Sequence, residues 1–261
     1  MHSPHTLFAC FFLVGFSPSI AAPSTITGAI DVRPSWGIGS SDPRLENEAA
    51  LKYAFSPKVS LGYVQEFWTT GPSSNGPGSF NMLPKDGYVR TDVTPFAEWR
   101  VYLPTDELER SRGFLSSLRN YLKLHLPLSP RLQLTIMEVP IVYAYQGRGQ
   151  TIDGVSMANR LFENRVYLTP SVSAFENRLT VSLPIIFQAE RYQEFQASAQ
   201  FDNRWRYLLW IYPEMIFAID PTTALGLAYY SENLIADDLS KLSVSEGLRS
   251  GIFQLVFQKT I

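Results

Sequence analysis

Histidine is the first residue type to consider for proton-transfer chemistry, and the sequence holds three. His2 and His5 precede an N-terminal apolar run, so His125 is the only candidate general base in the rest of the chain. A hydrolytic Ser–His pair needs a hydroxyl within hydrogen-bond reach of the imidazole. The next serine, Ser129, stands beyond Leu-Pro-Leu, which is not the His-x-Ser spacing of known lipid hydrolases. We therefore assign no catalytic residue and do not expect an enzyme.

Metal and cofactor chemistry has equally few candidate residues. The single cysteine, Cys10, lies in the N-terminal apolar run, so the rest of the chain offers neither a disulfide nor a thiolate. A zinc site there would have to be built mostly from carboxylates. The sequence also contains no glycine-rich phosphate-binding loop. We therefore expect no metal and no cofactor.

The charged residues are nearly balanced, with 22 basic and 24 acidic side chains and a net charge of -2. Such a chain has no bulk field to attract nucleic acid, so no nucleic-acid partner is expected. The informative charges are those that share one face of the predicted strands described below. These candidate site residues are Lys52, Glu66, Glu98, Arg100, Arg119, Lys123, Arg165, Glu190, Arg206 and Glu214.

The N-terminus has the pattern of a secretory signal peptide. An apolar run over residues 7–16 is followed by small residues at Ser19, Ala21 and Ala22, although no Lys or Arg precedes it. We place cleavage after Ala21, because a cut after Ala22 would leave Pro23 next to the scissile bond. The run is too short to span a bilayer as a helix. The predicted organisation is a signal peptide over 1–21 and one domain over 22–261.

Turn-forming residues divide the domain into strands. Tight turns are predicted at 56–58, 129–131, 176–178 and 220–222, with a fifth near 93–95. Longer polar connections near 39–46, 71–84, 105–113, 147–158, 193–199 and 233–247 alternate with them. Twelve strands result, although ten or fourteen also fit the pattern. They are predicted at 24–37, 46–55, 59–69, 85–93, 95–104, 114–128, 131–146, 159–174, 179–192, 200–219, 222–232 and 249–261.

Several predicted strands have one apolar and one polar face. In the strand at 114–128, leucines at 118, 122 and 124 alternate with Arg119, Lys123 and His125. A soluble β-sandwich would show the same alternation. The strand near 200–219 favours a membrane, because aromatics flank its aliphatic band at both ends, as in interfacial girdles. These aromatics are Trp205, Tyr207 and Phe217.

The last strand places Phe253, Leu255, Phe257 and Ile261 on one face, with Lys259 interrupting it. This run is similar to the C-terminal signal read by the barrel assembly machinery, although it ends in Ile rather than an aromatic. The chain after residue 21 resembles the bacterial outer-membrane β-barrels: an all-β, antiparallel, up-and-down transmembrane barrel. The resemblance implies the outer membrane of a Gram-negative cell, with membrane lipid and the assembly machinery as partners.

Three functional classes stay open for such a barrel. Charges of both signs on the inner face fit a narrow, porin-like channel for small solutes. The same charges could pair across the interior and fill it, giving a non-conducting structural or surface-interaction barrel. A barrel lipid hydrolase is the least favoured class. Small inward residues at Ala224, Gly226 and Ala228 favour the channel, and the Gly-, Ser- and Pro-rich segment 71–87 could constrict its mouth or lie at the surface.

Overall fold

The computed structural model describes residues 25–37, 44–70, 81–93, 95–152, 155–194, 205–235 and 251–260. The predicted signal peptide, most of the loop at 71–84 and Ile261 lie outside these residues. Among the residues described, no helix is long and apolar enough to cross a membrane.

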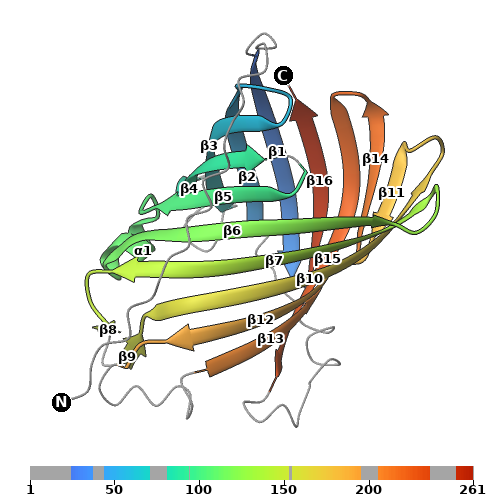
Figure 1. The fold of residues 1–261 in the computed structure, drawn as a ribbon. Helices are drawn as coiled ribbons and strands as arrows, with labels where there is room; N and C mark the ends of the chain where they lie inside the picture. The colour runs from blue at the N-terminus through green and yellow to red at the C-terminus, as the bar shows by residue number, and fades with distance from the viewer. Residues whose placement is uncertain are drawn as a thin grey trace.

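The described chain is almost entirely antiparallel strand, and sequence neighbours pair with one another around most of the sheet (Figure 1). The strands of the main sheet are β1 Thr25–Gly37, β2 Arg44–Ala54, β3 Val59–Thr70, β4 Asn81–Val93, β5 Ala97–Leu103, β6 Phe114–Pro127, β7 Leu132–Tyr145, β10 Arg160–Ala174, β11 Leu179–Ser182, β12 Ile185–Tyr192, β13 Trp205–Ile211, β14 Glu214–Asp220, β15 Thr223–Ile235 and β16 Ile252–Thr260.

The sheet closes into a barrel because its first and last strands pair, with Ala29 opposite Thr260 and Trp36 opposite Phe253. Pro184 and Pro213 lie at short gaps within the wall. Proline has no backbone N–H to donate to a neighbouring strand. Pro184 therefore divides one wall strand into β11 and β12, and Pro213 divides another into β13 and β14. The wall therefore has twelve strands, and the predicted fold class is confirmed. Closure leaves no exposed sheet edge.

Tight turns gather at one end of the barrel, as predicted. Ser56 Oγ accepts a hydrogen bond from the Val59 N–H at 3.1 Å, and Ser129 Oγ accepts one from the Leu132 N–H at 3.0 Å. The predicted turn near 93–95 is present, because the Phe96 N–H donates to the Val93 carbonyl at 3.0 Å. These side-chain and backbone bonds fix short connections between neighbouring strands.

The described parts of the connections at 105–113 and 147–158 lie at the other end and contain structure that the sequence pattern did not predict. The connection at 105–113 includes a short helix, α1 Glu107–Ser111, whose first turn is acidic and whose last turn holds Arg110. The connection at 147–158 includes a small hairpin, β8 Gly149–Ile152 and β9 Val155–Ala158. Three loop predictions were also too long, because β2 begins at residue 44, β4 begins at residue 81 and β15 continues to residue 235.

The outer face of the wall is apolar and exposed. Leu51 is 60% exposed, Leu118 50% and Val142 54%, and the alternate residues on the same strands face inward. Exposed aliphatic and aromatic side chains continue around the wall on most strands. A continuous apolar surface of this kind is unfavourable in water and favourable against hydrocarbon.

Part of the interior is packed rather than open. Tyr88 and Tyr102 are buried and stack with ring centroids 4.6 Å apart. Val64, Val139 and Ile141 belong to the same buried cluster, which lies along the inner face of β3 to β7. This cluster narrows the interior on one side and stabilises that half of the wall.

Candidate functional site

The barrel encloses a central cavity of about 600 Å³, which we call the lumen. Each of the twelve wall strands contributes at least one side chain to the lining of the lumen. Tyr212, in the gap between β13 and β14, is counted with that wall strand. The lining is mainly charged and aromatic. Its principal members are Arg33, Glu46, Glu66, Lys85, Asp86, Tyr102, Arg119, Tyr143, Arg160, Arg165, Trp210, Tyr212 and Tyr230.

Ion pairs gather inside the barrel near the tight-turn end. Glu98 is 5% exposed and accepts hydrogen bonds from Lys123 at 2.9 Å and from Arg100. Nearby, Lys52 lies 3.3 Å from the carboxylate of Asp92. Arg100 and Lys123 therefore share one carboxylate, which offsets one of their two positive charges.

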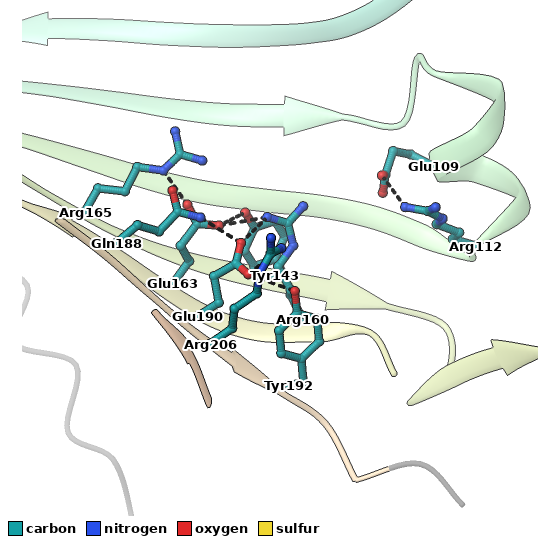
Figure 2. Close-up of polar contacts among 10 residues, drawn as sticks. All are labelled: Glu109, Arg112, Tyr143, Arg160, Glu163, Arg165, Gln188, Glu190, Tyr192 and Arg206. Atoms are coloured by element: carbon teal, nitrogen blue, oxygen red, sulfur yellow. Dashed lines mark hydrogen bonds and ion pairs between the residues drawn. The ribbon is translucent and has the colours of Figure 1, made fainter. Parts of the chain in front are cut away.

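A second network joins β7, β10, β12 and β13 (Figure 2). Glu163 is fully buried and accepts hydrogen bonds from Tyr143 at 2.6 Å, Arg160 at 3.0 Å and Arg165. The Arg160 guanidinium also reaches Glu190 at 3.1 Å. Glu163 thus links β10 to β7 through Tyr143, and Arg160 links β10 to β12 through Glu190.

Glu190 completes this network from β12. It accepts hydrogen bonds from Gln188 at 2.7 Å and Tyr192 at 2.8 Å, and Arg206 lies 3.6 Å away as an ion-pair partner. Three guanidinium groups thus share two carboxylates here. The network borders a cavity of about 360 Å³ toward the β8–β9 hairpin, and its surplus of positive charge faces that cavity.

The opposite side of the lumen is richer in acidic groups. Arg33 pairs with Asp31 at 3.0 Å, donates to Tyr212 at 2.8 Å and lies 4.0 Å from Glu214. Lys85 pairs with Glu66 at 3.3 Å. The acidic lining residues of this side, on β1 to β4 and β14, are Asp31, Glu46, Glu48, Glu66, Asp86 and Glu214. Both sides of the lumen therefore hold ion pairs, but acidic groups are in excess on this side and basic groups are in excess in the network of Glu163 and Glu190.

Arg119 differs from the other predicted cations. Its guanidinium lies 3.5 Å from the centroid of the Tyr102 ring, and within the described ranges it pairs with no carboxylate. Its Nε and the Nε1 of Trp210 are buried and donate to no described residue. Both side chains line the lumen.

All ten candidate residues lie on the inner faces, but they form several separate groups rather than one site. Glu163 was not among the predicted residues, although it shares the parity of Arg165. Arg160 has the opposite parity and lies inside because a bulge between Arg160 and Phe162 shifts the register of the strand. A register irregularity opposite Gln65 and Phe67 similarly brings Lys85 inward.

His125 lies among polar side chains of β6 and β7. The His125 Nδ1 lies 3.0 Å from Thr135 Oγ1 and 3.0 Å from Gln133 Nε2, so its hydrogen-bond neighbours are a threonine and an amide. Within the part of the chain that the structure describes, no group of three His, Cys, Asp or Glu side chains could hold a metal ion.

Solved structures with a similar fold were found, although no family model and no curated protein matches the sequence. The NanC porin aligns with 88% of this chain and 98% of its own at 12% identity, with a TM-score of 0.50. An outer-membrane channel of Pseudomonas putida F1 aligns with 94% of this chain and 97% of its own at 11% identity, with a TM-score of 0.52. The fold is that of the bacterial outer-membrane β-barrels. At these identities the likeness concerns the fold and not the solute.

One departure from the outer-membrane barrel pattern has a structural explanation. Lys259, on the apolar parity of β16, donates hydrogen bonds to the hydroxyls of Thr222 at 2.9 Å and Thr223 at 2.7 Å. Its ammonium group therefore lies at the tight-turn rim rather than along the apolar band. A lysine with its stem on the wall and its charge at the rim is compatible with a lipid-facing strand.

Proposed function

We propose that this protein is a channel of the bacterial outer membrane that passes small solutes through its lumen. The observation that carries the proposal is the central cavity, which is lined by every wall strand and is dominated by charged and aromatic side chains. An apolar exterior around a charged interior is the arrangement expected of a wall between lipid and water. The similarity to two channel structures supports the same function.

The unequal balance of charge on the two sides of the lumen would select solutes by their charge. An electric field across a narrow pore orients charged solutes. The pore favours solutes that can exchange their contacts with water for contacts with the protein. Arg100, Lys123 and Arg206 each have a carboxylate partner, so their contribution to selectivity is reduced. We therefore assign the main preference for anionic solutes to Arg119, whose charge no described carboxylate neutralises.

Reversal potentials under a salt gradient test this selectivity. Wild-type protein in planar bilayers is expected to prefer anions, and Arg119→Glu is expected to shift the reversal potential toward cation preference. Lys123→Glu is the matched control, because it reverses a charge that already shares Glu98 with Arg100. We expect its shift to be smaller. Cation preference in the wild type, or equal shifts in both variants, would contradict the role of Arg119.

Export to the outer membrane gives a second prediction. The mature protein is expected to begin at Ala22 and to fractionate with outer-membrane markers, because a barrel with an apolar exterior needs both secretion and assembly in lipid. N-terminal sequencing of detergent-extracted protein provides the measurement. Retention of Met1, or recovery as a soluble periplasmic monomer, would show this location to be wrong.

A further inference from the structure

The cavity of about 360 Å³ beside the lumen lies at the end of the barrel that carries the β8–β9 hairpin. We call this cavity the antechamber. Arg160, Arg165 and Trp210 line both the antechamber and the lumen, so the two cavities adjoin. A solute that moves between this end of the barrel and the lumen therefore passes these three side chains.

The antechamber presents cations to the solvent and keeps their partners behind them. Four arginines line it: Arg112, Arg160, Arg165 and Arg206. Of the described residues that line it, only Glu190 is acidic. The side chains of Arg160 and Arg206 are each 30% exposed, whereas that of Glu163 is fully buried and that of Glu190 is 3% exposed. Because the guanidinium groups lie in front of the carboxylates, the cavity attracts anions.

Aromatic rings and Glu163 fix how two of these guanidinium groups lie. Arg160 lies 4.8 Å from the centroid of the Tyr143 ring, and Arg165 lies 5.4 Å from that of Trp210. Arg165 donates to Glu163 through its Nε, and its two terminal nitrogens point away from that carboxylate (Figure 2). A guanidinium held in this way can donate two parallel hydrogen bonds to a carboxylate and loses little freedom on binding.

The antechamber also has an aromatic and aliphatic part. Its members include Tyr145, Met157, Leu208 and Trp210. Flat rings pack favourably against aromatic side chains and against guanidinium planes. The volume of about 360 Å³ is at the lower end of the range of about 300–1,000 Å³ that is usual for small-molecule sites. Such a volume suits a molecule of one ring better than a chain of several.

We propose that the antechamber binds organic anions in which a carboxylate is attached to a single ring, and that it selects these solutes for the lumen. The guanidinium groups hold the carboxylate, and the aromatic and aliphatic part holds the ring. A neutral ring lacks the first contact, and a small anion without a ring lacks the second. The inference rests on the proposed channel function, because a site beside the lumen selects a solute only if the lumen conducts.

Block of the current by benzoate tests this site in planar bilayers. Benzoate is expected to reduce the wild-type conductance in a concentration-dependent way. Benzamide, which has the same ring and no charge, should leave the conductance unchanged. Acetate, which has the charge and no ring, should need a concentration about tenfold higher or more for the same block.

A double variant tests which residues bind. Arg112→Gln with Arg206→Gln removes two of the four cations and leaves Arg160 and Arg165 paired with Glu163. This variant should need about tenfold more benzoate or more, because it loses hydrogen bonds to a charged group. Arg110→Gln with Arg148→Gln is the matched control, since it makes the same change of charge at exposed positions outside the antechamber. Its block should equal that of the wild type.

Saturation-transfer NMR of the detergent-solubilised protein measures the same binding without a current. Equal benzoate binding by the two double variants would overturn the site, and so would equal binding of benzoate and benzamide or of benzoate and acetate. Wild-type protein that conducts but does not bind benzoate would overturn the site and leave the channel intact. Folded protein that binds benzoate but passes no current would support the site and contradict the channel.

Discussion

Glu163→Ala is expected to destabilise the barrel by about 3–5 kcal/mol, the cost of leaving buried charges without their partner. The Glu163 side chain is fully buried and accepts hydrogen bonds from Tyr143, Arg160 and Arg165. Removing it leaves Arg165 without a described carboxylate and Arg160 with Glu190 alone. Urea unfolding of protein refolded in lipid vesicles would measure the change in free energy.

The chain offers a matched control for this variant. Glu109 and Arg112 form another Glu–Arg pair at 3.3 Å, but they lie on and after the short helix α1, and both side chains are partly exposed (Figure 2). Glu109→Ala should therefore cost no more than about 1 kcal/mol. Equal effects of the two substitutions would mean that the Glu163 network contributes no more than a surface pair.

Leu124→Arg and Leu183→Arg are expected to cost about 2–4 kcal/mol each when the barrel folds into lipid. Leu124 is 51% exposed and Leu183 39%, and both lie on the apolar exterior. An arginine at either position would carry its charge into hydrocarbon. Folding yield in vesicles, read from the heat-dependent shift of barrels on gels, would fall for both.

Lys123→Ala is the control for the first of these substitutions because it changes the adjacent residue on the opposite face. It removes one of the two cations that contact Glu98 and leaves Arg100 in place, so the carboxylate stays paired. Its folding yield should remain close to that of the wild type. If all three variants fold equally well, the assignment of inner and outer faces is incorrect.

The wall could be predicted from the sequence because a lipid-facing strand imposes a simple period of two. Leu118, Leu122 and Leu124 are outward, and Arg119 and Lys123 are inward, as the alternation indicated. Turn residues such as Ser129 also fix their hydrogen bonds locally, within three residues. Local rules of this kind need no knowledge of the remainder of the chain.

The inner networks could not be predicted in the same way. Bulges move Arg160 and Lys85 to the inner face. Pro84 and Gly87 flank the bulge at Lys85, but no glycine or proline marks the one at Arg160. In β7 the alternation is broken at Glu138, which lies outside between apolar outward residues, while Val139 and Ile141 pack inside. Which cation meets which carboxylate depends on cross-strand register, as in the contact of Arg160 with both Glu163 and Glu190.

The central claim is that the lumen conducts, and single-channel recording tests it most directly. Purified wild-type protein added to a planar bilayer is expected to produce discrete current steps. Leu124→Arg protein, prepared in the same way, should produce far fewer because less of it folds into lipid. Wild-type protein that is folded and inserted but gives no current above the bare bilayer would contradict the channel and identify the barrel as a closed one, filled by its own ion pairs and tyrosines.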